Sequence, residues 1–160
     1  MSILAGVKCH IAVDRFTDAH PLVQQSQARI QPPFHRFAAV LVDVFYDHFL
    51  ARDWHCYATT PFRLWVDEVY AQFLSYEGGL HTALREGLCR MVREDWLGQY
   101  HSLEGIAAIL QRMARRLSRP TLLGQAASQL EAHYDALRAD FHAYFPQLQQ
   151  FVTDWRAEHE

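Results

Sequence analysis

The apolar residues of this 160-residue chain recur at helical spacing along nearly its whole length. This feature constrains the fold most, because no stretch keeps the strict alternation of a half-buried strand. Only seven glycines and six prolines interrupt the pattern. The longest core helix by pattern covers 34–54, and its apolar stripe comprises Phe37, Val40, Leu41, Val44 and Phe45. The sequence therefore predicts an all-α protein.

Breaks in the pattern define about seven helices joined by short links. We expect helices at 3–17, 22–30, 34–54, 61–76, 80–96, 103–117 and 120–144. Thr60 and Ser102 are expected to act as N-caps, and Pro146 is expected to begin or kink the last helix. Because 160 residues with 50% apolar content can bury one core, we expect a single-domain helical bundle over residues 1–160.

Bulk composition excludes several classes of function. The formal net charge of −3 gives no overall basic field for nucleic acid. No apolar run approaches the roughly 20 residues that span a bilayer, and the first residues lack the pattern of a secretory signal. The three cysteines are dispersed and odd in number, which is typical of reduced thiols. These features indicate a cytoplasmic protein with neither a membrane nor a nucleic-acid partner.

Aspartate and histidine recur every four residues in two of the expected helices. His10, Asp14 and Asp18 share one side of the first helix, and Asp43 and Asp47 repeat the spacing in the third. Two helices that each offer such a pair on facing sides can build a metal site inside a bundle. Carboxylates with one or two imidazoles suit Mn²⁺ or Mg²⁺, which can polarise a phosphoryl oxygen and activate water.

The same residues also have structural interpretations. Aspartates of the first helix can pair with Arg15 or cap the next turn. Asp43 and Asp47 repel each other unless a cation lies between them, which counts against a purely structural role. His48 falls on the apolar stripe, where a core histidine bonded to a carbonyl is the commoner case. Spacing alone leaves both interpretations open.

The densest basic run is "RMARRLSR", which contains Arg112, Arg115, Arg116 and Arg119. Most of these side chains lie along one side of a helix and can form a docking face for an acidic partner. The alternative is an ordinary solvated helix face. Nucleic acid is a poor match, since no aromatic residues interleave with the arginines.

Four segments carry a resemblance to a known family. "GVKCHIAVDRFTDAHP" and "DVFYDHFLARDW" resemble two signatures of the acyl carrier protein phosphodiesterases, or ACP hydrolases. "WLGQYHSLEGIAAILQRMARR" and "LEAHYDALRADFHAYFPQL" resemble the C-terminal helices of that family. The segments occur in the family's order and extend over about residues 6–148. The chain is therefore identified as similar to this family over nearly its whole length.

The resemblance implies an all-helical fold distantly like the HD-type metal phosphohydrolases. It also implies hydrolysis of the phosphodiester that joins 4′-phosphopantetheine to a serine of acyl carrier protein, with Mn²⁺ or Mg²⁺. Within it, we infer metal ligation by His10, Asp14, Asp43 and Asp47. His20 or His48 would protonate the leaving serine oxygen, with Asp18 in the same catalytic set. Arg15 would offset phosphate charge, and the basic run would bind the acidic carrier protein.

The sequence departs from the family pattern at two points. Ile11 stands where the signature has arginine, which removes a potential phosphate contact. Family members also carry an upstream G-N-x-x-x-D segment whose aspartate has no counterpart here. We expect these departures to affect catalysis more than fold. A bundle short of that segment would expose an apolar face, which a homodimer would cover.

Two other functions follow if the hydrolase hypothesis is wrong. The chain would then be a carrier-protein-binding module of the same fold without turnover. Alternatively, it would be a helical ligand-binding or dimerisation domain in which the aspartates and histidines are structural. Metal-dependent turnover distinguishes these hypotheses.

Overall fold

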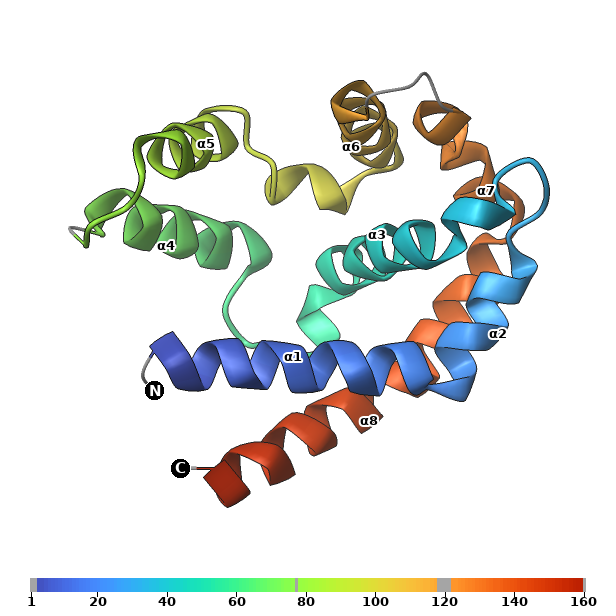
Figure 1. The fold of residues 1–160 in the computed structure, drawn as a ribbon. Helices are drawn as coiled ribbons and strands as arrows, with labels where there is room; N and C mark the ends of the chain where they lie inside the picture. The colour runs from blue at the N-terminus through green and yellow to red at the C-terminus, as the bar shows by residue number, and fades with distance from the viewer. Residues whose placement is uncertain (1–2, 77, 118–121, 160) are drawn as a thin grey trace. The chain divides into compact units, whose positions relative to one another are not determined.

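The structure is a computed structural model that describes residues 3–76, 78–117 and 122–159. Within these ranges it contains eight α-helices, four short 3-10 turns and no strand, so the predicted all-α class is confirmed (Figure 1). The helices are α1 (Ile3–Ala19), α2 (Pro21–Arg29), α3 (Ala38–Arg52), α4 (Phe62–Ser75), α5 (Thr82–Arg93), α6 (Leu103–Arg116), α7 (Ala127–Ala132) and α8 (Tyr134–His159).

The chain divides into two compact units. The first comprises residues 1–46 and 128–160, and the second comprises residues 47–127. Folding of both units as one domain, and a likeness to the HD-type hydrolases, stay predictions.

In the first unit, α1 and α2 both pack against the long helix α8 (Figure 1). Aromatic rings fill the junctions: Phe16 stacks on Phe151 at 4.5 Å between ring centroids, and Tyr46 meets Phe141 edge-on at 5.3 Å. Tyr46 and Phe141 are buried in the core, whereas Phe16 and Phe151 are partly exposed at its edge. Aromatic pairs of this kind add to the stabilisation from burial alone.

A buried polar group lies in the junction of α2 with α8. Asp140 of α8 is only 6% exposed and accepts hydrogen bonds from Gln25 Nε2, Ser26 Oγ and Arg29 Nε at 2.9–3.0 Å. Because Ser26 gives its single hydroxyl proton to Asp140, the Tyr46 hydroxyl donates to Ser26 Oγ, 2.9 Å away. Burial raises the pKa of Tyr46 to about 12, which keeps this donor protonated.

In the second unit, side chains cap the N-termini of two helices. Ser102 is the N-cap of α6, as predicted, and its hydroxyl accepts a hydrogen bond from the Gly105 amide at 3.0 Å. A Cβ at Gly105 would lie 1.9 Å from the carbonyl oxygen of Gln99, so only glycine fits there. His81 caps α5 through its ring nitrogen, which the sequence analysis did not predict.

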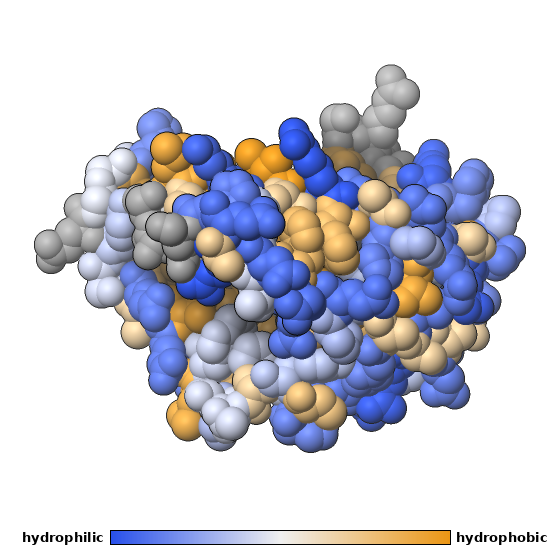
Figure 2. All heavy atoms as spheres, turned by 90° about the horizontal axis from the view of Figure 1, so that it is seen from below, coloured by the Kyte–Doolittle hydropathy of each residue, from blue (hydrophilic) through white to orange (hydrophobic). Residues whose placement is uncertain are grey.

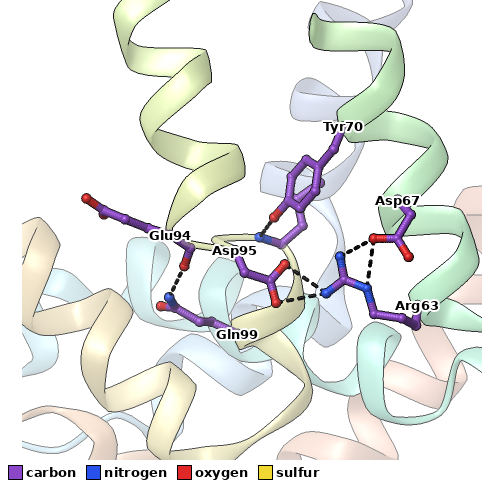
Figure 3. A network of polar contacts seen from close by, with 7 residues as sticks. Arg63, Asp67, Tyr70, Glu94, Asp95 and Gln99 are labelled. Atoms are coloured by element: carbon purple, nitrogen blue, oxygen red, sulfur yellow. Dashed lines mark hydrogen bonds and ion pairs between the residues drawn. The ribbon is translucent and has the colours of Figure 1, made fainter.

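A polar network links α4 to the turn that follows α5. Arg63 donates to both carboxylate oxygens of Asp95 at 2.8–2.9 Å and to Asp67 on its own helix (Figure 3). The Tyr70 hydroxyl accepts a hydrogen bond from the Leu97 amide at 2.7 Å. These bonds fasten the turn to α4.

Several local predictions differ from the structure. Thr60 is not the cap of α4, because Pro61 occupies the N-cap position without a side-chain hydrogen bond. The expected helix 120–144 is split into a 3-10 turn (Leu122–Gln125), α7 and the first half of α8, while Pro120 lies outside the described residues. Pro146 lies inside α8 and begins no new helix, so of its two predicted roles only a kink of the helix stays a prediction. Within the predicted apolar stripe, Leu41, Val44 and Phe45 are buried but Val40 is exposed.

The surface carries scattered apolar side chains. Figure 2 shows one face, on which hydrophilic residues surround separate groups of hydrophobic ones. On α1, Leu4, Val7 and Ile11 are exposed at one-turn spacing. Among the described residues, no helix combines the length and apolar character needed to cross a bilayer.

Candidate functional site

The first predicted cluster lies along one side of α1. His10 Nε2 is 3.5 Å from Asp14 Oδ2, and both side chains are mostly exposed. Asp18 follows one turn later and is also exposed. The helix therefore presents an imidazole and two carboxylates to solvent in the register that the sequence predicted.

Asp43 of α3 is electrostatically coupled to this side of α1. Its pKa is raised above the usual aspartate value, first by desolvation and then by the negative charges of Asp14 and Asp18. Helices α1 and α3 therefore place these three carboxylates within electrostatic range of one another. Such an arrangement favours cation binding, since a cation relieves the mutual repulsion.

The ligand geometry is looser than a closed metal cage. Among the residues described by the structure, no three histidine, cysteine, aspartate or glutamate side chains converge closely enough to hold a metal ion. The oxygen donors nevertheless match the chemistry of Mg²⁺ and Mn²⁺. These ions often use one or two protein carboxylates, with water and substrate phosphate completing the shell. The predicted ligand set of His10, Asp14, Asp43 and Asp47 stays a prediction.

His20 is a buried residue at the junction of α1 and α2. It is the N-cap of α2, and its Nδ1 accepts a hydrogen bond from the Leu22 amide at 3.3 Å. The neutral ring must then carry its proton on Nε2, which donates to Gln147 Oε1 at 3.3 Å. The ring also packs edge-on against Tyr144. Each His20 nitrogen thus already has a partner within the protein.

Tyr144 is a residue of the first unit that the sequence analysis did not single out. Its hydroxyl is 2.6 Å from Thr17 Oγ1, and its pKa is raised by burial and by the charges of Asp43 and Asp18. The Tyr144 hydroxyl is therefore within electrostatic range of the Asp43 and Asp18 carboxylates. The only sequence signal that pointed to Tyr144 was its position within the family-like segment "HAYFPQL".

The remaining residues of the second signature, His48 and Asp47, belong to the second unit. His48 is fully buried, and its Nδ1 is 2.8 Å from the Tyr100 carbonyl oxygen, as in the structural alternative. Burial lowers the pKa of His48, so the ring is neutral near pH 7 and Nδ1–H donates to the carbonyl.

Asp47 is exposed at the edge of a small aromatic pocket in the second unit. The cavity has a volume of about 90 Å³, and its walls include Trp54, Phe62 and Trp65. Trp54 and Trp65 lie 4.7 Å apart between ring centroids. A carboxylate at the rim of an aromatic pocket suits a ligand with amide donors and an apolar arm.

The predicted basic residues occur in both units. Arg15 is exposed on α1, and Arg112, Arg115 and Arg116 lie on α6. Arg119 lies outside the described residues. The α6 arginines line a groove together with Arg90 and Trp96. The sequence analysis did not connect these two residues with the arginines, because Arg90 lies on α5 and Trp96 lies in the loop between α5 and α6.

Comparison with known proteins gives the chain's relatives. It is 28% identical to the acyl carrier protein phosphodiesterase of Pectobacterium atrosepticum, over 94% of this chain and 78% of that protein. It is 30% identical to the protein of the same name from Photorhabdus laumondii, over 95% of this chain and 75% of the relative. The Escherichia coli O6:H1 protein of that name is 27% identical, over 92% and 77% respectively.

No solved structure matches the chain at a significant level. The sequence model of one family, the acyl carrier protein phosphodiesterases, matches residues 1–148. This match includes the α1 and α3 signatures and the coupled aspartates. The chain belongs to the acyl carrier protein phosphodiesterase family.

Proposed function

We propose that this protein hydrolyses the phosphodiester between 4′-phosphopantetheine and the serine of acyl carrier protein, releasing the apo-carrier protein and phosphopantetheine. The family match over residues 1–148 supports this reaction. The electrostatic coupling of Asp43 with Asp14 and Asp18 in the first unit supports a site at these carboxylates. Perturbed carboxylates that lack a neutralising partner are typical of catalytic sites.

The proposed cofactor is Mn²⁺ or Mg²⁺ beside these carboxylates. One or two of Asp14, Asp18 and Asp43 would hold it together with a substrate phosphate oxygen, with His10 and Asp47 as further candidate ligands. When bound, the ion supplies charge neutralisation at the phosphoryl group and a more acidic water. The carboxylates orient that ion and keep a negative site ready for it.

Proton transfer to the leaving serine oxygen requires an accessible group that titrates near neutral pH. His10 is accessible, because its side chain is exposed and its Nε2 lies 3.5 Å from the Asp14 carboxylate. His20 and His48, the residues predicted for the step, use ring nitrogens in contacts to Gln147 and Tyr100. Either one would have to break such a contact to act. We therefore place His10 first as the proton donor; in that role it would not be a metal ligand, and the carboxylates would hold the ion.

Substrate binding would use features of the second unit. The aromatic pocket beside Asp47 would take one short segment of the pantetheine arm, since its volume is only about 90 Å³. The acidic carrier protein would be attracted by Arg112, Arg115 and Arg116. Arg15 of the first unit would add a further positive charge. Docking of this kind weakens as salt rises, because screening shortens the range of the charges.

The test is intact-mass spectrometry of holo-acyl carrier protein incubated with the full chain, with Mn²⁺ or with chelator. We expect metal-dependent loss of the phosphopantetheine mass. Asp43→Asn should reduce the rate roughly 100-fold or more, since it removes charge from the site. Asp154→Asn is the matched control, because Asp154 is exposed on α8 and bonds Gln150 of the same helix.

Two outcomes would overturn the proposal. Unchanged mass with salt-sensitive binding of holo-carrier protein would identify a binding module instead. If the mass of holo-carrier protein is unchanged and it does not bind, the aspartates have a structural role. Equal rates for Asp43→Asn and Asp154→Asn would move the active site away from α3.

A further inference from the structure

A polar groove with a volume of about 520 Å³ lies in the second unit, between α5 and α6. Four arginines line it, against one acidic residue, Glu94. The arginines are Arg90, Arg112, Arg115 and Arg116. This excess of positive charge makes the groove a site for an anion.

Little inside the groove neutralises these charges. Arg112 donates to Gln99 Oε1 at 2.6 Å and lies 3.9 Å from Glu94. Within the described residues, no carboxylate forms an ion pair with Arg90, Arg115 or Arg116. Like charges one turn apart on α6 repel each other, so an anion bound between them would relieve the repulsion.

Trp96 orders two of the guanidinium groups. Arg112 Cζ lies 4.6 Å and Arg116 Cζ 4.9 Å from the indole ring centroid. Stacking on the ring reduces the freedom of both side chains while leaving their N–H edges available. The ring itself is anchored, because Trp96 Nε1 donates to Glu94 Oε2 at 2.8 Å.

The turn that presents Trp96 has an unusual backbone. Asp95 has a φ of 48°, in the left-handed region that a non-glycine residue adopts only at a cost. Arg63 and Tyr70 of α4 hold this turn through the bonds drawn in Figure 3, and Gln99 Nε2 donates to the Glu94 carbonyl at 2.6 Å. Strain that surrounding bonds maintain is common at ligand sites.

An apolar pocket adjoins the arginine groove. Its volume is about 220 Å³, and it shares Trp96, Arg112 and Arg116 with the groove. Its other walls are Met91, Leu97, Tyr100, Ile109 and Met113. The two methionines are flexible enough to adapt to an inserted chain. The guanidinium groups therefore stand where a polar cavity meets an apolar one.

We propose that this paired cavity binds an amphiphilic anion, with its hydrocarbon chain in the apolar pocket and its carboxylate or phosphate headgroup on Arg112 and Arg116. Guanidinium forks match both headgroups in a two-point geometry. The site lies wholly within the second unit and uses none of the carboxylates assigned to hydrolysis, but it shares Arg112 and Arg116 with the surface proposed to attract the carrier protein. Its occupancy can therefore be measured without turnover or carrier protein.

The test is isothermal titration of the full chain with four probes below their micelle concentrations: decanoate, decyl phosphate, decanol and decyltrimethylammonium, with inorganic phosphate as the headgroup alone. We expect decanoate, decyl phosphate or both to bind one to one, with affinity that falls as salt rises. The better of the two identifies the headgroup. The neutral, cationic and tail-free probes should bind at least about tenfold more weakly.

Two variants separate headgroup from tail. Arg116→Gln should weaken the anionic amphiphile roughly tenfold or more, because a charged hydrogen bond is lost. Met113→Gln should weaken it by a similar factor without changing the affinity for inorganic phosphate. Arg93→Gln, an exposed arginine of α5 outside the groove, is the matched control and should leave binding unchanged. Thermal melting of each variant checks the fold.

Three results would overturn the proposal. Binding of decyltrimethylammonium as tight as that of decanoate would show a general hydrophobic surface. Inorganic phosphate that binds as tightly as decyl phosphate would show a plain anion site without a tail pocket. Absence of binding by both anionic amphiphiles to the correctly folded chain would rule out the site.

Discussion

Asp140 and Asp43 both belong to helices of the first unit, but their neighbours differ sharply. Asp140 is buried and receives hydrogen bonds from Gln25, Ser26 and Arg29. Asp43 is exposed at the surface, but partial desolvation raises its pKa, and the negative charges of Asp14 and Asp18 raise it further. The first carboxylate is compensated by donors and a cation, whereas the second is left with like charges.

This difference separates a structural aspartate from a functional one. A buried carboxylate contributes to the fold only when donors offset its loss of hydration. Asp43 has no such compensation from its coupled neighbours, so its charge opposes folding. Sites that bind cations and phosphates often carry such a cost in stability. Substitutions at the two positions should therefore act in opposite directions.

The largest effect is expected at Asp140. Asp140→Ala should lower the free energy of unfolding by about 3 kcal/mol, because the Ser26 and Arg29 donors lose their acceptor inside the protein. Denaturant unfolding monitored by circular dichroism measures the loss. Asp140→Asn, which keeps one acceptor oxygen, should lose less. Equal stability of Asp140→Ala and the parent protein would mean that the network around Asp140 contributes nothing.

A smaller loss is expected for Tyr46→Phe. The variant removes the donor to Ser26 Oγ while keeping the ring contacts to Phe141, so the cost is that of one buried hydrogen bond, about 1 kcal/mol. A double-mutant cycle with Ser26→Ala measures the coupling directly. Additive losses would show that the two hydroxyls act independently and would detach Tyr46 from the Asp140 network.

The smallest effect, with opposite sign, is expected for Asp43→Asn. Since the folded-state pKa of Asp43 lies above its ordinary value of 3.8, the folded protein binds more protons than the unfolded chain between these two values. The parent protein therefore loses stability as pH rises through that window. The variant escapes this loss, so its melting temperature should exceed that of the parent at neutral pH.

The pH dependence checks the sign. The advantage of Asp43→Asn should shrink as pH falls towards the ordinary aspartate value and vanish below it, where Asp43 is protonated in both states. Thermal melts over a pH series measure it, with Asp154→Asn as the control. A variant that melts below the parent at neutral pH would show that Asp43 is a stabilising group like Asp140.

Local sequence signals predicted much of the helical pattern. Ser102 was found as a cap because its hydroxyl serves an amide only three residues away. The split of the expected helix 120–144 was missed because no glycine or proline marks the break at His133. Thr60 was chosen as a cap from residue type, whereas the backbone turns into α4 at Pro61. Signals confined to a few residues were reliable where no tertiary contact competed with them.

The candidate site shows the same division. Helical periodicity alone placed His10 beside Asp14, since one turn separates them. Periodicity gave no information about Tyr144, which lies far along the chain and reaches the carboxylates only because α8 packs against α1. The groove at Trp96 was missed for a similar reason, because its arginines come from two helices.

The sequence by itself determined the helical class, the family and the register of the acidic residues within each helix. These properties depend on spacing over a few residues and on motif order. Only the tertiary structure decided which charges are compensated. Asp140 and Asp43 are the same residue type on similar helices, and neighbours more than a hundred residues away give one of them its donors. Burial and long-range partners set the energy of a charge, and neither is encoded in local spacing.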